Sequence, residues 1–242
     1  MATTEAGARL TERHRQQQLA VRARALRLLL ALWPLFDPRN IDESWRTMEP
    51  AVLAIIGQGR VQSASVATGY FRAFRVVEGI AGDVLVPPAP RLNRTQVLTS
   101  LRVTGPVTAK RLTLLNRPDV APATFNVLAG ALGRYVLDAG RDTVMGAVRQ
   151  DRRALGWARV TSGEPCAFCA MLSGRGAVYS RETVDFRAHD ACACTSEPVY
   201  SRDAARPGRG EEFAALYNEA TRDAESGDLL NAFRRAYEGR AS

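Results

Sequence analysis

The sequence predicts a mainly α-helical α+β protein, in which long helices carry a small β-containing zinc-knuckle module. Two observations lead to this fold class. Apolar residues recur at helical spacing over most of the chain, whereas short alternating segments are confined to residues 155–200. The same segment contains all four cysteines and one of the two histidines.

The composition fits a soluble globular chain. Its 242 residues are 46% hydrophobic and 24% charged, which suffices for one large or two small cores. The net charge of +8 favours acidic partners, either nucleic acid or an acidic protein surface. The apolar run 26–36 is too short to span a bilayer and lacks a signal cleavage pattern, so we expect no membrane association and a reducing cytosol.

The N-terminal region, residues 1–82, is expected to be helical. Apolar residues at helical spacing predict one long helix over residues 4–33, which Pro34 ends. The polar first half of this helix suits a solvated arm, with docking onto a partner as the alternative. His14 lies in this half without a neighbouring ligand, so we expect it at the surface.

Two further helices complete this region. A short one is expected over residues 41–49, with Asn40 or Asp42 as its cap. Pro50 is expected to open the next helix, which runs to about residue 79.

A Pro-rich linker over residues 83–93 interrupts the helical periodicity and predicts a domain boundary. Beyond it we expect two short helices, over residues 95–101 and 107–115, joined at Gly105-Pro106. A long helix over residues 122–152 follows, with apolar residues along one side.

Residues 155–200 are expected to form a small sheet that docks on this long helix. Alternating residues predict a strand over residues 155–161, and short extended pieces are expected over residues 177–179 and 195–200. Together with the preceding helices, this module makes a predicted domain over residues 94–200.

The C-terminal region, residues 201–242, begins with a polar linker that contains Gly and Pro. Two amphipathic helices follow, one around Phe213 and Leu216 and one around Phe233, with Asp228 as the cap of the second. Aromatic residues at this spacing are more typical of a core than of a docking site on another subunit.

The cysteine spacing is the strongest functional signal. Cys166-x2-Cys169 is followed, after nineteen residues, by His189-x2-Cys192-x-Cys194. Two short turns of this kind can direct soft ligands at one tetrahedral ion, so we predict a zinc site. Five candidate ligands compete for four positions. Cys192 and Cys194 are alternate residues that share one face of a strand, so either completes the set.

The chemistry of these ligands predicts a structural ion. A thiolate-rich set fills the coordination shell, whereas a catalytic zinc keeps one position open. Zinc binding is worth on the order of 10 kcal/mol in zinc-finger peptides, enough to hold a small, loop-rich module together. The alternative is two disulfides or four free thiols, which the spacing and a reducing compartment disfavour.

No catalytic residues are predicted. The sequence contains no P-loop, no HExxH and no Gly-x-Ser-x-Gly elbow. Of the two histidines, His189 belongs to the thiol cluster, and four clustered thiols suit a single nucleophile poorly. A zinc deaminase is disfavoured because no His-x-Glu precedes the Pro-Cys-x2-Cys segment. The sequence therefore favours a non-enzymatic protein.

Three stretches of the module carry a family resemblance. They are residues 165–172 (Pro-Cys-Ala-Phe-Cys-Ala-Met-Leu), residues 175–179 (Arg-Gly-Ala-Val-Tyr) and residues 189–194 (His-Asp-Ala-Cys-Ala-Cys). These stretches resemble the Mu F-like minor head proteins of tailed bacteriophages, especially those of phages that infect actinobacteria. Arg175-Gly176 is expected to shape the loop between the two cysteine turns. Ala193 departs from the family, whose members often have a basic residue there.

The resemblance implies a minor capsid protein that lies inside the virion near the portal and is present in the host cytoplasm during assembly. It would act in head assembly and in DNA packaging or ejection. The implied partners are the portal protein and the major capsid or scaffold protein, with phage DNA as a further candidate. Related phage proteins are also labelled capsid maturation proteases, so a protease is the enzymatic alternative.

A basic DNA-binding module is the second alternative, because arginines are dense in the first helix. The candidate contacts are Arg9, Arg13, Arg15, Arg22, Arg24 and Arg27.

Overall fold

The computed structural model describes residues 1–161, 163–176, 179–180, 186 and 188–240. The elements, in chain order, are α1 (Glu5–Leu32), the 3-10 helix η1 (Trp33–Leu35), α2 (Ile41–Val77), α3 (Arg94–Arg102), the π-helical turn η2 (Val103–Val107), α4 (Thr108–Leu114), α5 (Val120–Gln150), β1 (Gly156–Val160), α6 (Ala167–Gly174), β2 (Tyr179–Ser180), β3 (Thr195–Val199), α7 (Gly210–Thr221) and α8 (Leu229–Gly239). The predicted class, mainly helical with a small sheet, is confirmed.

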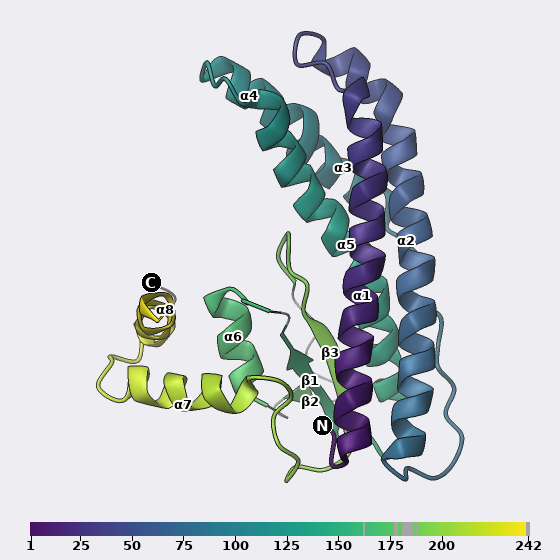
Figure 1. The fold of residues 1–242 in the computed structure, drawn as a ribbon, viewed down its shortest axis with the longest axis vertical. Coiled ribbons are helices and arrows are strands. Elements are labelled where there is room, and N and C mark those ends of the chain that lie inside the picture. The colour runs from purple at the N-terminus through teal and green to yellow at the C-terminus, as the bar shows by residue number, and fades with distance from the viewer. Residues whose placement is uncertain (162, 177–178, 181–185, 187, 241–242) are drawn as a thin grey trace.

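The long helices α1, α2 and α5 pack along one another and form the body of the molecule (Figure 1). Their shared core includes Leu29, Ile56 and Leu132, all fully buried. Burying a side chain of this size contributes roughly 1.5–3 kcal/mol. Gly59 lets α2 approach α5 closely, because a Cβ at this position would lie 2.7 Å from Cγ2 of Val136.

Helix α5 is the central element, and most of its second half is buried. It confirms the long helix expected over residues 122–152. By length and composition it is also the one helix in the described chain that could cross a bilayer, but 61% of its apolar window is buried inside the fold. Such burial is typical of the core helix of a globular protein.

Helix α2 corrects one expectation. The sequence predicted two helices that meet at Pro50, whereas the structure has one continuous helix with Pro50 inside it. Proline removes one backbone hydrogen bond, which normally ends or kinks a helix. Here Met48 and Val52, on either side of Pro50, are both fully buried, and their packing keeps the helix continuous.

The segment between α2 and α3, which includes the predicted Pro-rich linker, has no helix or strand, as expected. It lies along the long helices: Arg60 donates a hydrogen bond to the carbonyl of Pro90 (2.9 Å), and Arg75 donates one to that of Gly82 (2.7 Å). The division of the chain into domains stays a prediction.

The two short helices expected around Gly105-Pro106 are joined without a break. The π-helical turn η2 connects α3 to α4, and Pro106 lies inside it. A wider turn accommodates a proline, which cannot donate the usual backbone bond. Gly105 packs directly against Trp45, since a Cβ there would lie 2.8 Å from the indole ring.

The strands form an antiparallel sheet in the order β2-β1-β3. Trp157 in β1 pairs with Pro198 in β3 and with Tyr179 in β2. The sheet docks on α5, as predicted. The strand predicted from alternating residues over 155–161 is β1, and all five of its residues are buried, including Arg159. Residues 177–178 of the expected second strand lie outside the described residues.

The C-terminal helices α7 and α8 confirm the predicted pair. They pack on α6 and on each other, and Phe213 and Phe233 are fully buried. Their aromatic residues therefore belong to the core, as expected. Asp228 occupies the predicted cap position of α8, but its carboxylate pairs with Arg235 (2.6 Å) instead of capping the helix.

The polar first half of α1 is not a solvated arm. One side of it is buried: Thr11 shares a hydrogen bond with Tyr70 (2.8 Å) and donates one to the buried carboxylate of Glu197 in β3. Gln18 donates a hydrogen bond to the carbonyl of Ser63 in α2 (2.9 Å). Polar side chains that bond to one another across the helix interface make this buried surface possible.

His14 lies in this interface, which corrects its expected surface position. It is 2% exposed, and its ring stacks on Tyr70 with a centroid distance of 4.1 Å. Burial lowers the pKa of His14 to about 3.

This pKa makes folding stability depend on pH. Below about pH 6.5 the unfolded chain binds a proton at His14 that the folded chain does not, so stability is lost as pH falls. Between pH 7 and pH 5 the loss from this residue is about 2 kcal/mol. Urea unfolding of the wild type and of His14→Phe, which keeps the ring stack, measures it. The variant should lose about 2 kcal/mol less than the wild type, and equal losses would refute the assignment.

Candidate metal centre

The first predicted ligand pair lies at the beginning of α6. Cys166 is the N-cap residue, and its Sγ accepts a hydrogen bond from the backbone N–H of Cys169 (3.4 Å). The helix was not predicted, because the segment was interpreted as a bare turn. A helix N-terminus stabilises negative charge and therefore favours thiolates. Helix α8 supports this turn through a hydrogen bond from the Tyr237 hydroxyl to the Pro165 carbonyl (2.6 Å).

Helix α6 ends close to a glycine in the left-handed conformation. Gly176 has a φ of +65° and donates its N–H to the carbonyl of Ser173 (3.1 Å). This left-handed conformation favours glycine and closes many helices. The expected role of Arg175-Gly176 in the intervening loop stays a prediction, because residues 177–178, 181–185 and 187 lie outside the described part of the chain.

The second ligand pair lies on a turn that docks on α5. The N–H of Cys192 bonds to the carbonyl of His189 (3.1 Å), and Ala191 between them has a φ of +64°. The N–H of Ala191 bonds in turn to the carbonyl of Gly130 in α5 (3.0 Å). A Cβ on Gly130 would lie 3.3 Å from that nitrogen, so the glycine permits the close approach.

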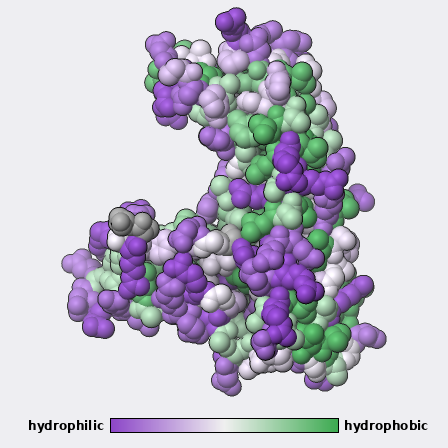
Figure 2. Space-filling view, viewed as in Figure 1, coloured by the Kyte–Doolittle hydropathy of each residue, from purple (hydrophilic) through white to green (hydrophobic). Residues whose placement is uncertain are grey.

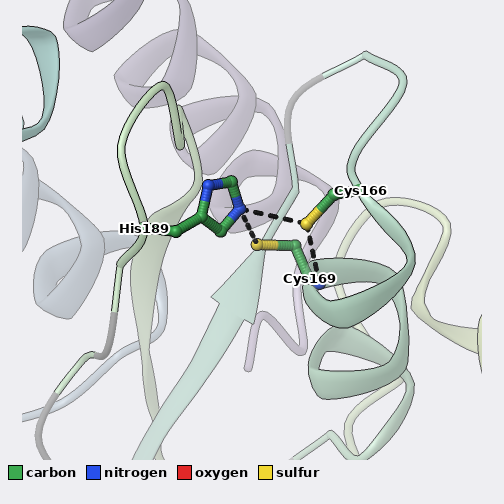
Figure 3. Close-up of side chains that lie close together, drawn as sticks. All are labelled: Cys166, Cys169 and His189. Carbon is green, nitrogen blue, oxygen red and sulfur yellow. Dashed lines mark hydrogen bonds between the residues drawn. The ribbon is translucent and has the colours of Figure 1, made fainter. Parts of the chain in front are cut away.

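The two turns converge (Figure 3). Nε2 of His189 lies 3.0 Å from Sγ of Cys166 and 3.7 Å from Sγ of Cys169, and the Sγ atoms of Cys169 and Cys192 are 3.7 Å apart. The ligand atoms fall into two sets, Cys166–Cys169–His189 and Cys169–Cys192–Cys194, each with its atoms within 4.8 Å of one another. Cys169 belongs to both sets.

This geometry suits a bound ion. Two thiolates about 2.3 Å from a tetrahedral zinc are about 3.8 Å apart, close to the 3.7 Å between Cys169 and Cys192. All four cysteines are free, so the disulfide alternative does not describe this structure. The cluster could therefore hold a metal ion. The sequence expectation that Cys192 and Cys194 face the same point agrees with the second set, and the choice between them stays open.

Two buried arginines surround the cluster, and sequence reasoning missed both. Arg159 is 1% exposed, with Nη1 3.7 Å from Sγ of Cys169 and 4.0 Å from Sγ of Cys192. Arg141 in α5 donates hydrogen bonds to the carbonyls of Cys192 and Cys194 (both 2.9 Å). A buried guanidinium needs negative partners, which thiolates supply. The sequence did contain an indication of both, since Arg141 lies within the predicted helix 122–152 and Arg159 within the predicted strand 155–161.

The thiols also favour a charged cluster. Considered without an ion, the pKa of Cys192 lies far below its usual value, chiefly because the Cys169 thiol donates a hydrogen bond to its sulfur, with a further contribution from Arg141. The same hydrogen bond raises the pKa of Cys169 well above its usual value. A lowered thiol pKa favours the thiolate, which is the form that binds a cation.

Of the six arginines predicted to contact DNA, two form ion pairs within α1. Arg9 pairs with Glu5 and Arg15 with Glu12. The other four differ in exposure: Arg13, Arg24 and Arg27 are exposed, and Arg22 is half-buried against α5.

Several known proteins are similar to this chain. The model of the VG15 protein family matches residues 5–220. The Gene 15 protein of Mycobacterium phage D29 is 42% identical over 69 residues, which cover 27% of this chain and 25% of that protein. The Gene 15 protein of Mycobacterium phage L5 is 42% identical over 67 residues, which cover 26% of this chain and 23% of that protein. The match thus spans about a quarter of these relatives. No solved structure matches the chain.

Cys169, which belongs to both ligand sets, provides a test of the metal centre. We expect protein purified without chelator to contain about one zinc ion per chain by elemental analysis. Cys169→Ser should lose the ion and unfold the module, because metal binding and folding are coupled. Cys192→Ser and Cys194→Ser serve as a matched pair, since one of them should keep the ion. Folded wild-type protein without stoichiometric metal would contradict the assignment.

Arg141 provides a second test. Arg141→Gln removes the hydrogen bonds that position the turn around Cys192, and removing such supporting groups typically weakens metal binding about 10- to 100-fold. Competition with a chromogenic chelator measures the affinity. The control is Arg152→Gln, which changes an exposed residue just beyond α5 and should leave the affinity unchanged. Equal affinities for the two variants would show that Arg141 does not support the site.

Proposed function

The chain belongs to the VG15 protein family, and we propose from this membership that it is a minor structural protein of a bacteriophage head. In this proposal it lies inside the capsid near the portal and takes part in head assembly and in DNA packaging or ejection. Its cysteine-rich module holds a structural zinc ion.

The family match carries the proposal, because it extends over residues 5–220 and includes both the helical body and the metal centre. The two relatives are mycobacteriophage proteins. The resemblance of residues 165–194 to Mu F-like minor head proteins supports the finer assignment to the head and to the portal region. The proposed partners are the portal protein and the major capsid or scaffold protein.

The ligand chemistry supports a structural zinc ion. Three of the candidate sulfur ligands, those of Cys169, Cys192 and Cys194, are at most 3% exposed. A buried, sulfur-rich set leaves little access for a substrate, whereas catalytic zinc sites keep one ligand position for water. The ion would instead join β3 to α6, and through the turn at Gly130 it would hold both against α5.

The protease alternative has less support. A hydrolase with a histidine base needs that residue beside a nucleophile and open to substrate. His14 is buried under Tyr70 with a pKa of about 3, and His189 lies among the thiols. His14 is therefore excluded as a base, whereas the exposed His189 lies 3.0 Å from Sγ of the exposed Cys166, so metal binding by these thiols decides against the protease.

Purified phage particles test the proposal. Quantitative mass spectrometry should find this chain in the virion in far fewer copies than the major capsid protein, in the head fraction after heads and tails are separated. Chemical cross-linking should join it to the portal protein more often than to the major capsid protein.

Absence from the virion would overturn the structural role. Cleavage of capsid or scaffold protein by the purified chain, abolished by replacing one Ser, Asp or Cys without unfolding, would establish the protease instead.

A further inference from the structure

The positive charge of this protein is concentrated on two helices. Residues 13–36 and 50–77, which make up most of α1 and α2, contain eight arginines and no aspartate or glutamate. Their charge equals the formal net charge of the whole chain, +8. Elsewhere basic and acidic residues balance. An electrostatic field of one sign along a helical hairpin attracts an anionic partner.

Four of these eight arginines are engaged within the protein. Arg15 pairs with Glu12, Arg75 with the buried Asp151, and Arg60 donates to the carbonyls of Tyr135 and Pro90. Arg22 points toward α5, where its Nε lies 2.8 Å from the position a Cβ on Gly133 would take. The remaining four are exposed, and the described part of the chain gives them no ion pair: Arg13, Arg24, Arg27 and Arg72.

Helical geometry places the three arginines of α1 on one face, and Arg72 is exposed on the neighbouring α2. At about 100° per residue, Arg24 and Arg27 lie within roughly 40° of Arg13 around the axis of α1, whereas Arg22 lies on the opposite side. Arg13 and Arg24 are separated by three turns, or about 16 Å. In Figure 2 hydrophilic patches alternate with apolar ones along the part of the molecule where α1 faces the viewer.

Two hollows in the groove between α1 and α2 are each lined by one arginine and by uncharged polar side chains. The first is lined by Arg13 together with Gln17 and Ser65. The second is lined by Arg24 together with Gln58 and Gln62. His14 and Tyr70 also line the first hollow. Each hollow thus sets one arginine beside at least two uncharged hydrogen-bonding side chains, with no acid among its lining residues. These are the side-chain types that commonly contact phosphate oxygens in DNA complexes.

The spacing and the buried aromatic residues favour double-stranded DNA. A separation of about 16 Å is comparable with the distance between phosphates that border the major groove, which is about 12 Å wide between backbones. Proteins that bind single strands present exposed aromatic rings for base stacking. Here the rings of His14, Tyr70 and Phe74 are buried between the helices, so the face offers none of them for stacking.

We propose that the α1–α2 face, carrying Arg13, Arg24, Arg27 and Arg72, binds the phosphate backbone of duplex DNA without reading its sequence. The face is separate from the metal centre, since it lies on the side of α1 opposite Arg22. The proposal also stands independently of the location of the protein in the virion.

Fluorescence anisotropy with a labelled 30-base-pair duplex and the full chain tests it. Replacing the four arginines of the face with glutamine should weaken binding at least about tenfold at 100 mM salt. It should also reduce the slope of log K against log salt by up to about 3.6, or about 0.9 for each phosphate that is no longer neutralised. The matched control replaces four exposed arginines on other elements, Arg39, Arg94, Arg111 and Arg234, with glutamine. This control removes the same charge and should retain most of the affinity and the slope.

Three results would overturn the proposal. The first is that wild-type protein does not bind the duplex at low salt. The second is an equal decrease in affinity for the two quadruple variants, which would make binding a diffuse effect of net charge. The third is that polyglutamate of matched charge competes as well as unlabelled duplex, which would assign the face to an acidic protein. Circular dichroism and thermal unfolding establish that both variants are folded.

Discussion

The structure depends on bringing two cysteine turns, about twenty residues apart in sequence, to one point on the side of α5. Both turns contribute buried residues to the main hydrophobic core, among them Cys169 and Cys192. The turn at Cys192 is held from α5 by backbone and guanidinium hydrogen bonds, from Gly130 and Arg141 respectively. The turn at Cys166 is held by the start of α6 and by Tyr237. A cation shared by the two turns would connect these supports, and the sheet and the C-terminal helices would then form one cooperative unit with it.

This arrangement explains why α5 is long and why its two halves differ. Its first half carries exposed positions such as Val127, whereas most of its second half is buried, where it packs against α1, α2 and the sheet. Arg141 can be tolerated there because it donates to two carbonyls and to Asp138, so its charge is not left unpaired. The same helix therefore provides the hydrophobic core and the polar support of the metal centre.

Much of this could be predicted from the sequence where a local pattern determines the result. Apolar periodicity located the long helices, and cysteine spacing located the five candidate ligands. The failures share a physical cause, which is that tertiary packing overrode a local preference. Pro50 was expected to begin a helix, but buried neighbours carry α2 past it. His14 was expected in solvent because its own helix is polar, and only the position of Tyr70 in α2 shows that it is buried.

The arginines also show what composition cannot predict and what helical geometry adds. Composition gives a net charge of +8 but cannot separate a cation that stabilises the interior from one that faces a partner. Helical phase separates them: Arg22 and Arg13 are nine residues apart, which is half a turn out of register, so one points to α5 and the other away from it. Inward arginines such as Arg159 approach thiol sulfurs and would offset the negative charge of a thiolate-rich metal site. The outward ones lie in the acid-free stretches 13–36 and 50–77 and form no ion pair within the described part of the chain, so their field extends into solvent and can act on an anionic partner.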